Sequence, residues 1–206
     1  MKRPTLPVAI ALLGATFYLW AANPWEEKPW GEWSQAEVNK VLQDSPWARR
    51  TSMRTAGGKP EYVVQWASSA TIRQAWARDA QLNGGADAET INKYVSGDTP
   101  NVEIHIQPYA FGAFVAGPRD IPCGPPVFLR PDSRKEGVPM LPQINFHGDD
   151  QGRMMRVELN FPREVEKQPL ITPQDKKVTF SCGAGDALIR VEFDLSKMTR
   201  DRKPDL

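Results

Sequence analysis

The chain has 206 residues, with 26 lysines and arginines against 25 aspartates and glutamates, and 40% of its residues are hydrophobic. This length suits one ordinary domain, and the composition excludes a disordered chain and a multi-span membrane protein. A net charge of +1 leaves no basic excess for phosphate contacts, so nucleic acid is not expected as a partner.

The first residues are typical of a targeting segment. Lys2 and Arg3 precede an uncharged, mostly apolar stretch over residues 6–22, which is the pattern of an export signal. Residues 1–22 therefore act either as a cleaved signal peptide, with Ala22 as a small residue near the cut, or as a retained membrane anchor flanked by aromatic residues such as Trp25. Either way we expect residues 23–206 to form a single exported domain, periplasmic or extracytoplasmic, that contacts the membrane only through its N-terminal segment.

Three helices are expected in the first half of this domain. Ser34 and Glu37 form a capping-box pattern at the start of the first, which ends before Pro46. A strand over residues 61–66 follows, and then come a helix begun by the capping residues at 68–71 and a helix capped by Asp87.

Beyond Val102 the hydrophobic period changes to two, which indicates strands. The alternating runs cover residues 102–106, 143–147, 155–161, 178–182 and 189–195, with a further strand at 127–129, and the turn formers at 147–152 predict a hairpin between the second and third runs. The alternation places His105 on the wetter face of its strand. The predicted fold class is α+β, with N-terminal helices packed on a mainly antiparallel β-sheet formed by the C-terminal half.

The two cysteines, Cys123 and Cys182, are predicted to form a disulfide because export brings them into an oxidising compartment. The chain-entropy model assigns such a bridge roughly 4 kcal/mol. The alternative is two unpaired cysteines, with Cys182 as a core side chain. No CxxC motif is present, so neither a redox enzyme nor a closed zinc site is expected.

Several patches resemble a group of uncharacterised exported bacterial proteins. They are Pro29-Trp30, Trp33-Ser34, Ser45-Pro46-Trp47-Ala48, Gln65-Trp66-x-Ser68, Phe161-Pro162-Arg163, Lys176-Lys177-Val178-x-Phe180 and Phe193-Asp194-Leu195-x-x-Met198. The resemblance spans most of the exported part, and the segment around Cys123 has least in common with the group. It implies an exported domain of unknown function and supplies no site residues.

Two histidine-containing patterns are candidates for chemistry. His147 with Asp149 and Asp150 places an imidazole and two carboxylates at a hairpin tip, where they would bind a divalent cation or act in acid–base catalysis, unless they form a polar turn only. His105 lies on one strand face with Glu103, but a third positioned group is not visible. No catalytic motif, phosphate loop or dinucleotide fingerprint is present, so no cofactor, metal site or catalytic residue is assigned.

The remaining binding candidates are Trp47 and Trp66, which would bind a sugar or protein partner if exposed and would belong to the core if buried. Ser68 and Arg73, near the start of the second helix, would receive an anion. Two hypotheses follow. The preferred one is a non-catalytic binding or interaction module at the cell envelope, whose partner is an envelope protein or a small ligand. The alternative is an envelope hydrolase or small-ligand binder whose polar site assembles only in the fold.

Overall fold

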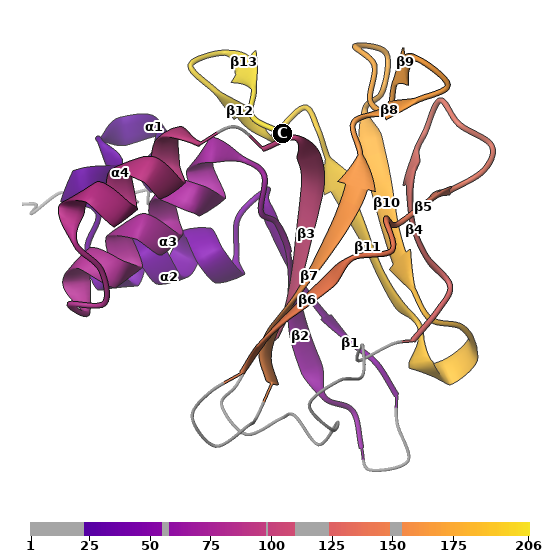
Figure 1. Ribbon diagram of the computed structural model, residues 1–206, viewed down its shortest axis with the longest axis horizontal. Helices are drawn as coiled ribbons and strands as arrows, with labels where there is room; N and C mark the ends of the chain where they lie inside the picture. Colours follow the sequence, from indigo (N-terminus) through magenta and orange to yellow (C-terminus); the bar gives the residue numbers. More distant parts are fainter. Residues whose placement is uncertain (1–22, 55–57, 98, 110–123, 149–153) are drawn as a thin grey trace, which may run out of the picture.

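The computed structural model describes residues 23–54, 58–97, 99–109, 124–148 and 154–206, which form three layers (Figure 1). A helix layer lies against a five-stranded sheet, and a four-stranded sheet lies on the opposite side of that sheet. The predicted leader at 1–22, Cys123, and the turn residues Asp149 and Asp150 lie outside the described residues.

The predicted helices are confirmed, and each begins at a capping residue. Ser34 and Glu37 form the capping box of α2, Ser69 accepts a hydrogen bond from the backbone of Ile72 in α3, and Asp87 caps α4. The described helical segments are α1 (Pro24–Glu27), η1 (Trp30–Glu32), α2 (Gln35–Gln43), α3 (Ala70–Leu82), α4 (Ala88–Ser96) and η2 (Gly185–Ala187).

The five-stranded sheet is antiparallel throughout, with strand order β1-β2-β3-β7-β6. The predicted hairpin is confirmed, since β6 and β7 are adjacent antiparallel strands. The strands are β1 (Ala48–Ser52), β2 (Glu61–Trp66), β3 (Asn101–Pro108), β6 (Ile144–Gly148) and β7 (Met154–Pro162).

The second sheet has the order β11-β10-β4-β5 and is also antiparallel. Its strands are β4 (Val127–Pro131), β5 (Val138–Pro139), β10 (Lys177–Cys182) and β11 (Ile189–Asp194), and two small pairs complete the fold: β8 (Glu164–Val165) with β9 (Gln168–Pro169), and β12 (Thr199–Arg200) with β13 (Lys203–Pro204). The sequence predicts one sheet, whereas the strands divide between two, because two apolar sheet faces can bury each other.

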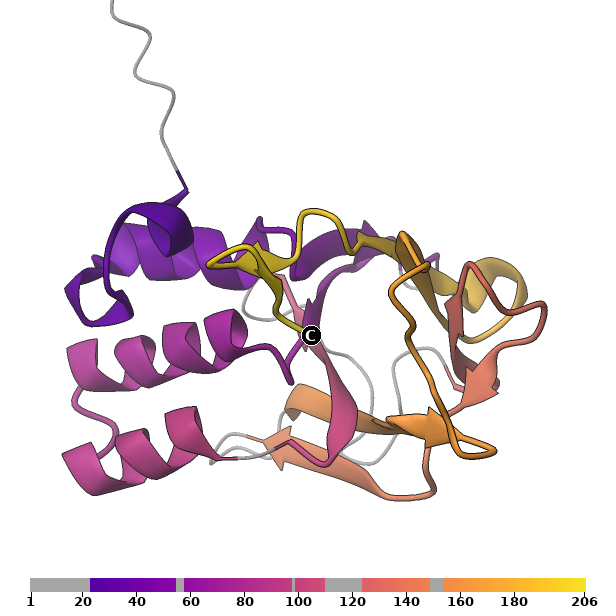
Figure 2. The same ribbon diagram turned by 90° about the horizontal axis from the view of Figure 1, so that it is seen from above.

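The apolar core lies between the two sheets. Trp66 of β2 packs edge-on against Phe193 of β11 at 5.3 Å between ring centroids, and Phe161 of β7 packs in the same way against Phe180 of β10 at 6.3 Å. The fold is therefore α+β as predicted, with the helices covering the outer face of a sheet whose inner face is sealed by a second sheet (Figure 2).

The helix-facing side of the five-stranded sheet carries polar residues. Gln65 of β2 donates to the backbone oxygen of Leu42 in α2 at 2.6 Å and accepts from the indole of Trp76 in α3 at 3.3 Å. These bonds hold α2 and α3 over β2. On that strand Gln65 lies directly opposite His105 of β3. The expectation that His105 lies on a wet face is wrong: its side chain is 1% exposed, because the helix layer covers it.

The segment after the predicted leader packs on the domain. Trp25 is buried, and its ring meets that of Trp47 edge-on at 5.5 Å, while the indole of Trp33 donates to the backbone oxygen of Pro24 at 3.1 Å. Trp25 is thus a core residue and not an aromatic ring placed at a membrane surface. Among the described helices, none is both long and apolar enough to cross a membrane.

Candidate functional site

The chain contains two histidines, and both imidazoles meet at the carboxylate of Glu158. The strand register explains this meeting. Glu158 of β7 pairs with His105 of β3 on one side and with Asn145 of β6 on the other, so it lies in the middle of three strands. His147 comes two residues after Asn145 on β6 and therefore lies on the same sheet face.

Four side chains form what we call the His–Glu cluster: Glu103, His105, His147 and Glu158. His147 Nε2 lies 2.7 Å from Glu158 Oε1, and His105 Nε2 lies 3.6 Å from the same oxygen. His105 Nε2 also contacts Glu103 Oε1. One ligand-type atom from each of Glu103, His105 and Glu158 lies within 4.8 Å of the other two.

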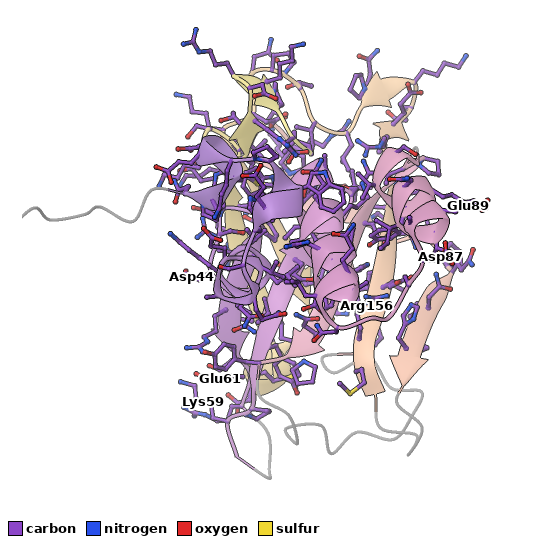
Figure 3. All side chains as sticks on the ribbon, turned by 90° about the vertical axis from the view of Figure 1, so that its left-hand side faces the viewer. Asp44, Lys59, Glu61, Asp87, Glu89 and Arg156 are labelled. Carbon is purple, nitrogen blue, oxygen red and sulfur yellow. The ribbon has the colours of Figure 1, made fainter. Side chains whose placement is uncertain are left out.

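Two further side chains hold the carboxylate of Glu158 in place. Arg156 Nη2 donates to Oε1 at 2.9 Å, and Asn145 Nδ2 donates to Oε2 at 3.2 Å. The guanidinium of Arg156 also lies 5.4 Å from the centre of the Trp76 ring in α3, so it bridges the sheet and the helix layer. Arg156 is labelled in Figure 3, in which the helix layer faces the viewer.

The cluster is sealed at one end and open at the other. The exposed fractions of its side chains are 1% for His105, 15% for Glu158, 29% for Glu103 and 46% for His147. The open end lies at β6, the edge strand of the sheet. His147 is therefore the member of the cluster that is most exposed to solvent.

Burial and hydrogen bonding set the charges of the two residues on β3. Burial lowers the pKa of His105 and favours its neutral imidazole, although Glu103 opposes this effect. Burial alone would raise the pKa of Glu103, but the hydrogen bond with His105 and the positive charge of Arg156 outweigh it, and the pKa of Glu103 is lowered. The arrangement is a neutral imidazole beside an ionised carboxylate.

The tryptophans proposed as binding residues belong to the core. Trp47 and Trp66 are fully buried, so of the two alternatives the core role holds for both. The Trp47 indole donates to the backbone oxygen of Asp205 at 2.7 Å, and Trp66 packs on Phe193.

The predicted anion position at the start of α3 receives a carboxylate from the chain itself. Asp205 accepts hydrogen bonds from the backbone nitrogens of Ala70 at 2.6 Å and Thr71 at 3.0 Å. Ser68 is buried nearby, while Arg73 donates to the backbone oxygen of Gly97. The N-terminus of α3 is thus occupied by an anionic group of the chain itself, the Asp205 side chain.

The predicted disulfide involves Cys123, which lies outside the described residues. Its predicted partner, Cys182, is fully buried at the end of β10. The Sγ atom of Cys182 lies 3.5 Å from the backbone oxygen of Gly124, the residue that follows Cys123 in the sequence.

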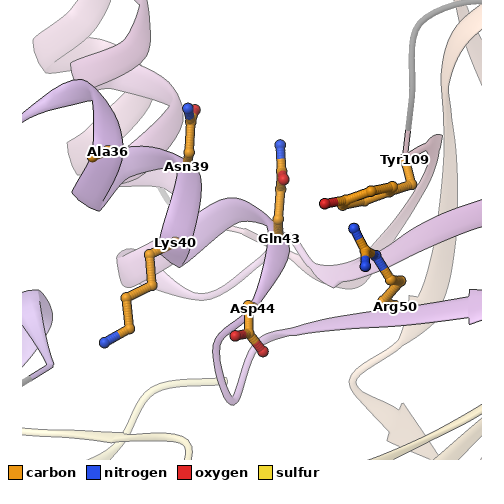
Figure 4. Close-up of a pocket in the computed structure, with 7 residues that line it drawn as sticks. All are labelled: Ala36, Asn39, Lys40, Gln43, Asp44, Arg50 and Tyr109. Atoms are coloured by element: carbon orange, nitrogen blue, oxygen red, sulfur yellow. The ribbon is translucent and has the colours of Figure 1, made fainter. Parts of the chain in front are cut away.

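A separate pocket of about 430 Å³ lies between α2 and the sheet (Figure 4). Its lining includes Asn39, Gln43 and Asp44 of the α2 end, with Arg50 stacked on the ring of Tyr109 at 3.0 Å from the ring centre. The guanidinium of Arg50 and the ring of Tyr109 are thus stacked on each other, and neither histidine is among the residues that line this pocket.

Sequence reasoning identified Glu103, His105 and His147 but missed Glu158 and Arg156. The alternation of β7 puts Glu158 and Arg156 on one face, but only the register between three strands shows that this face meets both histidines. His147 belongs to β6 and not to the turn, and the carboxylate that contacts it comes from β7.

Comparisons with protein-family models, with curated proteins and with solved structures each gave no match.

Proposed function

We propose that this chain is an exported binding module of the cell envelope, and that it holds a small ligand or ion at the His–Glu cluster. One observation carries the proposal: the two histidines of the chain, which come from different strands, meet at one carboxylate in a cluster that opens at a sheet edge. Export is supported by the basic residues at 2–3 and the apolar run at 6–22. The resemblance to uncharacterised exported bacterial proteins agrees with this placement.

Burying polar side chains in the His–Glu cluster lowers the stability of the fold, and this loss of stability supports a binding role. A buried polar atom without a partner typically destabilises a protein by about 1–3 kcal/mol. Among the described residues, His105 Nδ1 and Arg156 Nε are buried without a hydrogen-bond partner. Apolar residues of similar size at these positions would avoid the cost, so the cluster is best explained by what it binds.

Nuclear magnetic resonance spectroscopy, with the imidazole signals of His105 and His147 as the readout, tests the proposal. Separate titrations with Zn²⁺, Ca²⁺, inorganic phosphate, acetate and glucose would be followed in the wild type, in Glu158→Gln and in the surface control Glu192→Gln. We expect one probe to shift both imidazole resonances saturably in the wild type and the control, and to leave Glu158→Gln unchanged. If no probe shifts both resonances, or if Glu158→Gln responds like the wild type, the proposal is wrong.

Export has its own test, because it does not depend on the cluster. The intact mass of the native protein from the envelope fraction would show whether residues 1–22 are removed or retained. Recovery of the protein from the cytoplasm, with the leader intact, would overturn the envelope assignment.

A second candidate is an envelope hydrolase, favoured by the contact between His147 and Glu158. A half-exposed imidazole held by a carboxylate is the arrangement of a general base that activates water. Ester and phosphodiester reporters would test it: turnover that is lost in His147→Gln and kept in Glu192→Gln would make the protein an enzyme. Binding without turnover would leave the module non-catalytic.

A further inference from the structure

We propose that the His–Glu cluster binds one divalent transition-metal ion, with Zn²⁺ as the ion of this class that suits it best. This inference rests on the proposed function and names its ligand. The ligands are Nε2 of His105, Nε2 of His147 and the carboxylates of Glu103 and Glu158.

Three of the donors already lie close together, since one ligand-type atom from each of Glu103, His105 and Glu158 lies within 4.8 Å of the other two, and His147 joins them through its contact with Glu158. Zinc binds imidazole nitrogen and carboxylate oxygen at about 2.0–2.2 Å, which in a tetrahedral site places neighbouring donors about 3.3–3.6 Å apart. His105 Nε2 lies 3.6 Å from Glu158 Oε1, and His147 Nε2 lies 2.7 Å from the same oxygen. Small side-chain rotations would open the second distance around an ion.

The second, independent observation is the isolation of His105. This imidazole is almost completely buried, and among the described residues its Nδ1 atom has no hydrogen-bond partner. The ring's directional contacts among these residues are therefore made by Nε2, with Glu103 and Glu158. Nε2 is therefore the ring nitrogen that faces the two carboxylates and would bind the ion.

The donor set discriminates among cations. Ca²⁺ and Mg²⁺ prefer sites built from oxygen, whereas imidazole nitrogen favours zinc, copper, nickel and iron. Two imidazoles with two carboxylates therefore favour a transition metal over the alkaline-earth ions. Tetrahedral coordination by four protein donors is the arrangement that zinc adopts most readily.

Arg156 and Asn145 surround the ligands and tune the site. Asn145 fixes the orientation of Glu158 through its second carboxylate oxygen, as residues behind metal ligands commonly do. Arg156 donates to the oxygen that the metal would take, so its positive charge competes with the ion. The nearby ring of Trp76 offers the guanidinium an alternative contact when the ion binds.

Isothermal titration of the exported protein with Zn²⁺, and optical absorption with Co²⁺ as a coloured substitute, test the proposal. We expect one ion per chain and the intense absorption of a tetrahedral cobalt site. His147→Gln and Glu158→Gln each remove one ligand and should weaken binding at least tenfold, because even changes behind the ligands cost about 10–100-fold. The control Glu192→Gln should bind like the wild type.

Arg156→Gln separates metal binding from a structural role of the cluster. Removal of the competing charge should tighten zinc binding severalfold, whereas a purely structural ion-pair network would gain nothing. If Glu158→Gln fails to fold, His147→Gln decides the matter, because its side chain lies at the open edge of the sheet. Thermal melting of each variant without metal would establish that it is folded.

The failure of this inference differs from the failure of the proposed function. Zinc that does not bind, or that binds equally well to the wild type, His147→Gln and Glu158→Gln, would overturn the metal site. If phosphate, acetate or glucose still shifts both imidazole resonances, the binding module stands with another ligand. If no probe shifts them, both proposals fail.

Discussion

Asp175 is the acidic residue whose replacement should destabilise the fold in a pH-dependent way. This buried carboxylate accepts from the backbone nitrogen of Ser133 at 2.9 Å, and from the backbone nitrogen and hydroxyl of Thr172 at 2.7 and 2.8 Å. It thereby ties the loop before β10 to the turn after β4. Burial opposes ionisation, but these hydrogen bonds outweigh it and lower the pKa of Asp175 from 3.8 to about 2.

The pKa of Asp175 sets how much its carboxylate contributes to the free energy of unfolding. Each pKa unit corresponds to about 1.36 kcal/mol, so the ionised carboxylate contributes about 2 kcal/mol to the free energy of unfolding at pH 7. Because the folded-state pKa is the lower one, this contribution is complete above the unfolded-state value of about 4 and is lost as the pH falls through 2. At pH 3 about half of it remains.

The assay is urea unfolding followed by tryptophan fluorescence, for the wild type and Asp175→Asn at pH 7 and pH 3. We expect the substitution to lower the free energy of unfolding by about 2–3 kcal/mol at pH 7, and by clearly less at pH 3. Glu192→Gln, which breaks an exposed pair with Lys177, is the control and should change little at either pH. An equal loss at both pH values, or none at pH 7, would show that the ionised Asp175 carboxylate does not stabilise the fold.

Three further predictions concern the rest of the fold. Asp205→Ala removes the carboxylate at the start of α3 and should cost about 1–2 kcal/mol in urea unfolding; an unchanged midpoint would show that the cap is unimportant. Trp66→Ala should cost about 3–5 kcal/mol by the same measurement, because its ring fills the core against Phe193; a loss below 1 kcal/mol would contradict this packing. If Cys123 and Cys182 form a bridge, their thiols should react with an alkylating agent only after reduction, which intact mass would show; labelling without reduction would exclude the bridge.

The helices follow from local signals, and the sequence predicts them well. The capping box at Ser34 and Glu37 needs only residues three apart, and Asp87 caps α4 through the backbone of Thr90 in the same way. Such contacts do not depend on the rest of the fold. The strands follow in the same manner from period-two alternation, as in the inward residues of β10 and β11.

The exposure of each sheet face could not be predicted, because alternation does not show what covers it. Polar residues usually mark the wet face of a strand, yet His105 and Gln65 lie beneath helices that come from elsewhere in the chain. The same limit applies to the site. His147 and Glu158 belong to adjacent strands, but their contact depends on a register that includes an irregularity after His147.

The most direct measurement is X-ray anomalous scattering at the zinc absorption edge, from crystals of the protein grown with one equivalent of Zn²⁺. We expect a single strong peak about 2.0–2.2 Å from Nε2 of His105, Nε2 of His147 and a carboxylate oxygen of Glu158. A peak at surface carboxylates alone, or the absence of any peak with His105 and His147 still in contact with Glu158, would contradict it.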